Sequence, residues 1–237
     1  ADYGPDNLTY DRFLKGYRPT EAFKPVFTQG VADEYLQMMH AREDLACSFE
    51  SLTVRELNTE VLLPPARDLR PAVLRPVLQA CREGKRVEIE YASLANPEPE
   101  FRVIQPHTVV HTGYRWHVRA WCEKNGDFRD FVLSRISDQP ELVLPGDCGA
   151  EDDEALRTRV VVRLGPDPRL SPPQQALIER DYGMEQGELR LETRGALVSY
   201  LLQQLRVDSP ADHRSAEAQQ VVLLNQDEIQ RWAVMPG

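Results

Sequence analysis

Residues 91–136 read YASLANPEPEFRVIQPHTVVHTGYRWHVRAWCEKNGDFRDFVLSRI, a stretch in which apolar and polar residues alternate as they do in β-strands. Two turn signals divide it: Thr112-Gly113, and the stronger Lys124-Asn125-Gly126-Asp127, which predicts a tight hairpin. After that hairpin the chain is expected to return as a strand over 128–136. Several short antiparallel strands with few residues between them predict a small closed or half-closed barrel.

The same stretch concentrates positive charge. From 101 to 136, six basic residues stand against three acidic ones, a net charge of +3 in a chain whose net charge is −10. A basic region on a strand scaffold favours a pocket for an anionic ligand, because guanidinium groups bind phosphate in bidentate fashion. The acidic remainder argues against nucleic-acid binding by the surface as a whole.

Alternation assigns the side chains of the strand over 114–122 to two faces. One face carries Arg115, His117, Arg119 and Trp121. The other face, with Trp116, Val118 and Ala120, is expected to belong to the core. Two guanidiniums, an imidazole and an indole on one side can hold a phosphate and stack a base. From alternation alone, an exposed and salt-bridged sheet face fits equally well.

The residues before and within the strands carry helix and bulge signals. A helix is predicted that begins at Pro71 or Pro76 and is stopped by Gly84, since proline suits a first helical turn and glycine a helix end. The residues after it alternate cleanly and predict the first strand. Pro106 interrupts the strand predicted over 102–111, so it is expected at an edge or a bulge.

The two ends of the chain have patterns of their own. Residues 1–29 predict two short strands with a tip between them, and residues 31–46 predict a helix. Residues 159–232 follow the order strand, helix, strand, helix, strand and short helix, which is typical of a compact α+β unit of ferredoxin-like type. The acidic run over 151–154 is interpreted as a solvated linker.

Composition excludes several classes of protein. At 237 residues, with 41% hydrophobic and 28% charged residues, the chain is expected to form one or two soluble domains. It contains no apolar run that could cross a bilayer, and its N-terminus shows no signal-peptide pattern. The four cysteines form no CxxC pair, which argues against a zinc ribbon and favours a reduced, cytoplasmic protein.

The sequence gives little support for a metal site or a catalytic site. His107, His111 and His117 lack acidic or cysteine partners at suitable spacing, so neither a metal site nor a cofactor is expected. Ser93 has no histidine and aspartate arranged around it as in a catalytic triad. The chain is therefore not expected to be an enzyme, although a hydrolase that uses Ser93 or His107 stays a rival interpretation.

Four motifs occur in a defined order along the predicted strands. They are Tyr91-x-Ser93, Arg102-x-Ile104-x-Pro106-His107, Gly113-Tyr114-Arg115-Trp116-His117-Val118-Arg119-Ala120-Trp121 and Phe128-Arg129-x-Phe131-x-Leu133-Ser134-Arg135-Ile136. In this order they resemble the WYL-domain transcriptional regulators, in particular the BREX/CBASS-type branch found beside bacterial anti-phage defence operons. The triplet that names the family is here Trp116-His117-Val118. The resemblance covers most of the chain.

The resemblance implies an α+β protein in three parts. Residues 1–65 would hold the wing of a winged helix-turn-helix, a helix and a connector. Residues 66–146 would form the WYL domain as a small Sm-like antiparallel β-barrel. Residues 155–237 would form a ferredoxin-like C-terminal extension domain, and the helix-turn-helix proper is expected upstream of Ala1.

The resemblance also implies a homodimeric transcription factor, most simply a repressor, that binds operator DNA and senses an anionic nucleotide or a short nucleic acid. The residues expected to bind this ligand are Tyr91, Ser93, Arg102, His107, Arg115, His117, Arg119, Arg129 and Arg135. The wing residues expected to meet the DNA backbone are Arg12, Lys15 and Arg18. The alternative is a single-strand nucleic-acid-binding accessory protein without a direct transcriptional role.

Overall fold

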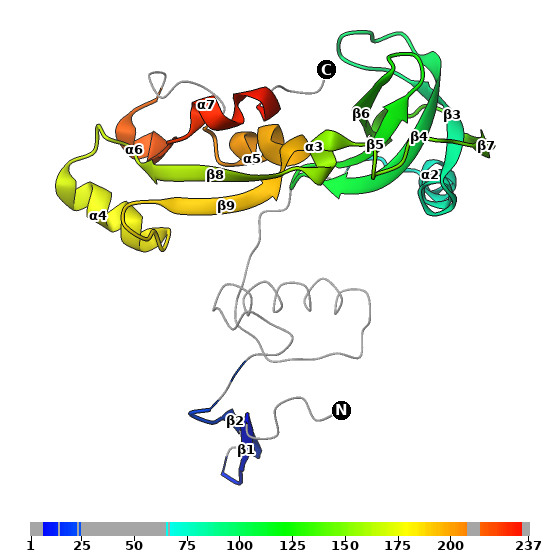
Figure 1. Ribbon diagram of the computed structural model, residues 1–237. Helices are drawn as coiled ribbons and strands as arrows, with labels where there is room; N and C mark the ends of the chain where they lie inside the picture. Colours follow the sequence, from blue (N-terminus) through cyan, green and yellow to red (C-terminus); the bar gives the residue numbers. More distant parts are fainter. Residues whose placement is uncertain are drawn as a thin grey trace. The chain divides into compact units, whose positions relative to one another are not determined.

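The structure is a computed structural model that describes residues 7–13, 15–22, 24, 65, 67–207 and 214–233 (Figure 1). It comprises two compact units, residues 1–63 and residues 64–237. Within the described residues, no helix is both long and apolar enough to span a membrane. The same residues contain no group of three or more His, Cys, Asp or Glu side chains placed to hold a metal ion.

The described part of the first unit is a two-stranded hairpin. β1 (Leu8–Asp11) pairs antiparallel with β2 (Gly16–Pro19), and Asp11 faces Gly16 next to the tip. The prediction of two short strands with a tip between them is confirmed. The helix predicted over 31–46 lies outside the described residues.

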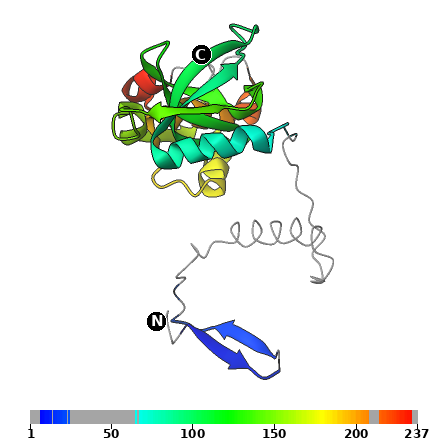
Figure 2. The same ribbon diagram turned by 90° about the vertical axis from the view of Figure 1, so that its right-hand side faces the viewer.

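The second unit begins with a helix on a five-stranded sheet. The helix is α2 (Pro71–Glu83), and the strands in chain order are β3 (Lys85–Tyr91), β4 (Glu100–His111), β5 (Trp116–Cys122), β6 (Asp127–Val132) and β7 (Glu141–Pro145). Their spatial order is β6-β5-β4-β3-β7, and every neighbouring pair is antiparallel. α2 lies across one face of this sheet (Figure 2).

Helix α2 begins and ends at residues that the sequence predicts for these positions. Pro71 occupies its first turn, and Gly84 ends it with a φ of 62°, a left-handed conformation that glycine adopts without strain. Val73, Val77 and Ala80, spaced as i, i+4 and i+7, point from the helix into the core that it shares with the sheet. Complete burial of a valine side chain stabilises a fold by about 1.5 kcal/mol or more.

The sheet is not closed into a barrel, which corrects the prediction. β6 and β7 are its two edge strands and do not pair with one another within the described residues. The strand predicted over 128–136 ends at Val132, because the chain turns there into the 3-10 helix η1 (Leu133–Arg135). An isolated bridge from Ile136 to Tyr91 brings the chain back to β3, and β7 then pairs along the outer side of β3.

Pro106 lies next to a β-bulge, as predicted. The register between β4 and β5 shifts between Pro106 and Thr108, so His107 is the extra residue. The pairing of β4 with β3 ends at Ile104, and the missing N–H of the proline therefore breaks no hydrogen bond to β3.

The remainder of the second unit is a three-stranded antiparallel sheet with helices. The strands β8 (Arg159–Pro166), β9 (Leu189–Arg194) and β10 (Val221–Leu223) lie in the order β10-β8-β9. The helical segments are α3 (Glu154–Arg157), α4 (Pro172–Asp181), η2 (Gly195–Leu197), α5 (Val198–Gln204), α6 (Ala216–Gln219), α7 (Gln226–Ile229) and η4 (Gln230–Trp232). α5 and α7 share a core with β8 (Figure 1).

The predicted order of strands and helices in this sheet is confirmed. Its described residues nevertheless form three strands, and not the four of a complete ferredoxin-like unit. Both sheets and their helices together make an α+β fold, as the sequence predicts.

The acidic run over 151–154 is not a solvated linker. Asp153 is only 1% exposed and caps α3, because its carboxylate accepts a hydrogen bond from the backbone N–H of Leu156. α3 packs closely on η2, where a Cβ on Gly195 would lie 2.9 Å from the carbonyl oxygen of Ala155. The segment between the two sheets is therefore folded and tightly packed.

Candidate ligand-binding site

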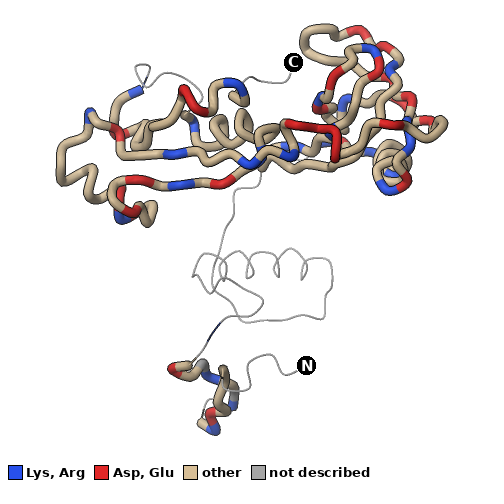
Figure 3. The backbone as a smooth tube through the Cα atoms, viewed as in Figure 1, with Lys and Arg blue, Asp and Glu red and all other residues tan. Residues whose placement is uncertain are grey.

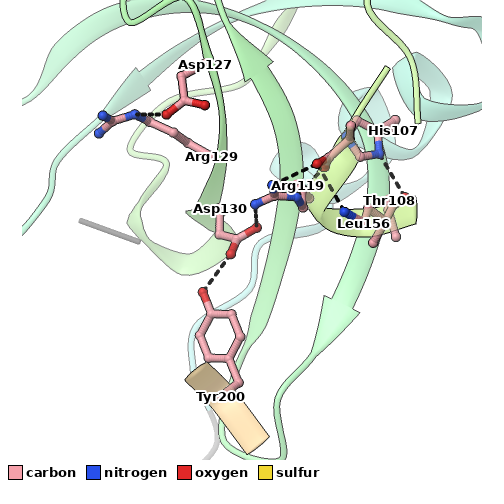
Figure 4. Close-up of polar contacts among 9 residues, drawn as sticks. His107, Thr108, Arg119, Asp127, Arg129, Asp130, Leu156 and Tyr200 are labelled. Atoms are coloured by element: carbon pink, nitrogen blue, oxygen red, sulfur yellow. Dashed lines mark hydrogen bonds and ion pairs between the residues drawn. The ribbon is translucent and has the colours of Figure 1, made fainter. Parts of the chain in front are cut away.

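Strand β5 carries a buried arginine. Arg119 is 6% exposed, and its Nε and Nη2 contact the two carboxylate oxygens of Asp153, with 3.0 Å between Nη2 and Oδ1. Its Nη1 lies 3.3 Å from Oδ1 of Asp130 on β6 (Figure 4). The positive charge of Arg119, which the sequence predicts to meet a ligand, is thus matched by two carboxylates.

Asp130 connects the two sheets through a hydrogen bond. Its Oδ2 accepts from the hydroxyl of Tyr200 on α5 at 2.9 Å (Figure 4). Burial raises the pKa of Asp130, although the charge of Arg119 and the Tyr200 hydroxyl act against this rise. Burial would lower the pKa of Arg119, but its hydrogen bond to Asp153 and the charges of both carboxylates raise that pKa overall.

Two further arginines of the predicted site face carboxylates. Arg102 contacts Glu100, and its Nη1 lies 3.1 Å from Oδ1 of Asn125. Nε of Arg129 lies 4.0 Å from the carboxylate of Asp127 (Figure 4). Figure 3 shows basic and acidic residues interspersed along both sheets, which fits this pattern of pairing.

Three other predicted ligand residues make local contacts. The Tyr91 hydroxyl accepts a hydrogen bond from the backbone of β6 at 3.2 Å, and Ser93 Oγ accepts one at 2.9 Å from the backbone of its own turn. Nδ1 of His107 lies 2.9 Å from the hydroxyl of Thr108, and Nε2 lies 3.5 Å from the Asp153 carboxylate. Burial lowers the pKa of His107, and the charge of Asp153 partly offsets that effect.

Two adjoining cavities lie between the β4–β5 turn and the residues that precede α2. The larger has a volume of about 290 Å³, and its lining includes Arg67, Leu69, His111, Tyr114, Arg115 and Trp116. The smaller has a volume of about 160 Å³ and is lined by Arg67, Thr112, Tyr114, Arg115, Tyr200 and Gln203. Because they share two arginines, we call them together the basic cavity.

The arginines at the basic cavity differ from those described above. Within the described part of the chain, the side chains of Arg67 and Arg115, which line the cavity, have no hydrogen bond or ion pair, and neither has that of Arg135, which lies outside the lining. Burial is the main reason why the pKa of His117 falls to about 4, and the positive charges of these arginines lower it further. A histidine with this pKa is neutral at pH 7, and the arginine charges are the second cause of its low value.

An aromatic surface adjoins these charges. The rings of His111 and Trp116 lie 4.6 Å apart between centroids on neighbouring strands. Trp116 is 48% exposed, which corrects its predicted place in the core, because it begins β5 beyond the buried cluster. An exposed indole next to a guanidinium provides a stacking surface for a nucleic-acid base.

Of the predicted ligand residues, Arg115 alone lines the basic cavity as the structure describes it, and His117 and Arg135 lie near it, since the charges of Arg115 and Arg135 both lower the pKa of His117. The others take part in the contacts described above, away from the cavity lining. Arg67 was missed by sequence reasoning, since it lies in a connector without periodic pattern. Asp153 was also missed, although an aspartate directly before the α3 residues is a recognisable N-cap signal.

Comparison with known proteins identifies the family. Residues 1–41 match the BrxR transcriptional regulator winged helix-turn-helix domain, residues 72–139 the WYL domain, and residues 159–229 the BrxR transcriptional regulator C-terminal dimerization domain. The DNA-binding transcriptional repressor CapW of Escherichia coli (strain KTE188) is 39% identical over 226 residues, which are 95% of this chain and 75% of that protein. The chain belongs to the BrxR/CapW family of WYL-domain transcriptional regulators.

Further relatives of this BrxR/CapW-family regulator have the same description. CapW of Pseudomonas aeruginosa is 37% identical over 97% of this chain and 77% of that protein, and CapW of Stenotrophomonas maltophilia is 32% identical over 96% and 76%. A solved structure of proteasome accessory factor B/C (PafBC) of Arthrobacter aurescens has a TM-score of 0.33 and 15% identity, over 81% of this chain and 31% of that chain. That last similarity is too weak to bear on fold or function.

The family assignment locates the buried charges within the regulator. Arg119 and Asp130 lie in the WYL match, Tyr200 lies in the dimerization-domain match, and Asp153 lies between the two. The CapW relatives are transcriptional repressors and not enzymes, in agreement with the prediction for this chain. The domain boundaries predicted at 65, 146 and 155 stay a prediction.

Replacing Asp153 by asparagine is expected to destabilise the regulator by about 3 kcal/mol, because the buried charge of Arg119 would lose its ion pair with Asp153 and be left with Asp130 alone. Urea-induced unfolding followed by circular dichroism measures this change. Glu151→Gln, at an exposed position of the same segment, is the matched control and is expected to change stability by less than about 0.5 kcal/mol. A D153N protein as stable as the wild type would show that this ion pair contributes little.

The stability of the regulator is expected to fall as the pH is lowered from 7 to 5. His117 titrates at about 4 in the folded protein and near 6.5 when unfolded, so the unfolded state binds more protons in this window. The stabilisation is complete above the unfolded pKa and is lost as the pH falls towards the folded one. The difference between the folded and the unfolded pKa corresponds to a stabilisation of at most about 3.4 kcal/mol.

Urea unfolding at both pH values tests this dependence with the variant His117→Phe, which keeps an aromatic ring where that of His117 lies 5.1 Å from the ring of Tyr200 between centroids. The variant is expected to lose less stability between pH 7 and pH 5 than the wild type. His111→Phe, at an exposed position of the neighbouring strand, is expected to behave like the wild type. Equal pH dependence in H117F and the wild type would refute the assignment.

Proposed function

We propose that this protein is a homodimeric transcriptional repressor that binds operator DNA. Its CapW relatives carry that description, and residues 1–41 and 159–229 match a winged helix-turn-helix and a dimerization domain. A two-fold symmetric dimer suits operators, which are commonly pseudo-palindromic. The resemblance to regulators of anti-phage defence operons extends the proposal to genes of that kind.

The effector in this proposal is an anionic nucleotide or a short oligonucleotide bound in the basic cavity. The observation that carries it is that Arg67 and Arg115 have no carboxylate partner among the described residues of a chain with net charge −10. Guanidinium groups grip phosphate in bidentate fashion, and Trp116 offers a ring for a base. The larger part of the cavity, about 290 Å³, lies near the lower end of the range for small-molecule sites, roughly 300–1,000 Å³. This size suits a ligand no larger than a single nucleotide, or one nucleotide of a short oligonucleotide.

Effector binding changes operator affinity only if the dimer adopts two arrangements, one that binds the operator well and one that does not, and if these bind the effector with unequal affinity. The WYL domain carries most of the basic cavity, and the dimerization domain contributes Tyr200 to its lining. A change at the cavity therefore has a direct route to the part of the chain that is proposed to pair with a second copy. No observation favours the alternative of an accessory protein without a transcriptional role.

The variants Arg115→Ala and Arg67→Ala are each expected to weaken binding of a short thymidine oligonucleotide by about tenfold or more, because each removes a charge-assisted contact to phosphate. Fluorescence anisotropy at constant salt concentration measures the affinity. Arg190→Ala removes the same charge from an arginine on β9 that pairs with Glu188, and it is expected to bind like the wild type. Equal affinities for all four proteins, or no binding by the wild type, would contradict the proposed effector site.

The wing hairpin is proposed to contact the DNA backbone. Arg12 and Lys15 are exposed beside its tip, whereas Arg18 lies 2.9 Å from the carboxylate of Asp11. R12A and K15A are each expected to reduce the slope of log affinity against log salt concentration by about 1, and R18A by less. Titration of labelled duplex DNA at several salt concentrations measures these slopes, and slopes equal to that of the wild type would exclude the contact.

A further inference from the structure

Helix α5 of the dimerization-domain match reaches into the WYL-domain cavity. Tyr200 and Gln203 of α5 line the smaller part of the basic cavity together with Arg67 and Arg115. The β4–β5 turn also lies close to this helix, since a Cβ added to Gly113 would be 3.5 Å from the side chain of Gln204. The lining of the cavity therefore comes from both domains.

Tyr200 has a specific place in this arrangement. Its hydroxyl donates to Asp130 at 2.9 Å, and its ring lies 5.1 Å from that of His117 between centroids. Burial raises its pKa first of all, the Asp130 carboxylate raises it further, and the charges of Arg115 and Arg119 act in the opposite direction. The phenol thus lies within the electrostatic influence of both the buried carboxylate and a cavity arginine.

The groups on the two sides of Tyr200 differ. On one side, Arg119, Asp130 and Asp153 form a buried cluster in which two carboxyl groups contact one guanidinium. The cavity side presents Arg67 and Arg115, which have no carboxylate partner within the described residues. An anion held by these two arginines would be a second strong acceptor close to a phenol that has one proton to donate.

We propose that Tyr200 transmits effector binding to the dimerization domain by changing its hydrogen-bond acceptor. It donates to Asp130 in the arrangement seen here, and to an oxygen of the anion when one is bound between Arg67 and Arg115. Since one phenol cannot donate to both acceptors, effector binding releases α5 from β6. This inference rests on the effector site proposed above and assigns Tyr200 as its positioning residue.

Hydrogen exchange of the α5 backbone, with and without a short thymidine oligonucleotide, tests this role. In the wild type, the oligonucleotide is expected to speed exchange over residues 198–204 several-fold, because the Tyr200–Asp130 hydrogen bond is lost. Tyr200→Phe keeps the ring beside His117 and is expected to bind the oligonucleotide about three- to tenfold more weakly. Its α5 exchange is expected to be equally fast with and without the oligonucleotide.

Two controls keep the interpretation clear. Tyr182→Phe, at the C-terminal end of α4, removes a hydroxyl elsewhere in the same domain and is expected to behave like the wild type. Asp130→Asn leaves a weaker, neutral acceptor and is expected to speed α5 exchange without any oligonucleotide.

The outcomes separate this inference from the proposed function. If the wild type binds the oligonucleotide but its α5 exchange does not change, Tyr200 transmits nothing, although the effector site stands. The same conclusion follows if Y200F shows the full response of the wild type, or if D130N leaves α5 exchange unchanged. If the wild type fails to bind, or R115A binds as well as the wild type, the proposed effector site itself is wrong.

Discussion

The buried guanidinium of Arg119 organises much of the second unit. Removing an arginine from water is costly, and carboxylates held at suitable positions are needed to offset that cost. Asp153 supplies one from the N-terminus of α3, and Asp130 supplies another from β6. Because Asp130 also accepts a hydrogen bond from Tyr200, this cluster joins β5, β6, α3 and α5, and so sets where the WYL and dimerization domains meet.

The same pairing distinguishes arginines that stabilise the fold from those available to a ligand. Arg102 and Arg119 contact carboxylates directly, whereas Nε of Arg129 lies 4.0 Å from the Asp127 carboxylate and is buried without a hydrogen-bond partner in the described part of the chain. Arg67 and Arg115 have no carboxylate partner in the described part of the chain, and they border a cavity next to an exposed tryptophan. In an acidic protein, an anion binds most favourably to a guanidinium that has no carboxylate partner within the protein, because no existing ion pair has to be broken.

The position of the basic cavity bears on regulation. A cavity enclosed within one domain would bind an effector without a direct effect on its neighbour. Here the lining includes Tyr200, whose hydroxyl is already engaged by Asp130. In the proposed mechanism, effector binding and domain contact share one proton donor, and such sharing is a simple physical origin for coupling between two sites.

Local sequence patterns were enough to predict most helices and strands, the turn at 124–127 and the bulge beside Pro106, because the signals for these features lie within a few residues of one another. The ordered motifs were likewise enough to predict the family. Charge pairing and sheet closure were not predictable in this way. Asp153 lies 34 residues from Arg119, and an ion pair across such a separation leaves no local pattern. The folded chain alone establishes which arginines find carboxylates, and that the sheet stays open because β7 pairs with β3 and not with β6.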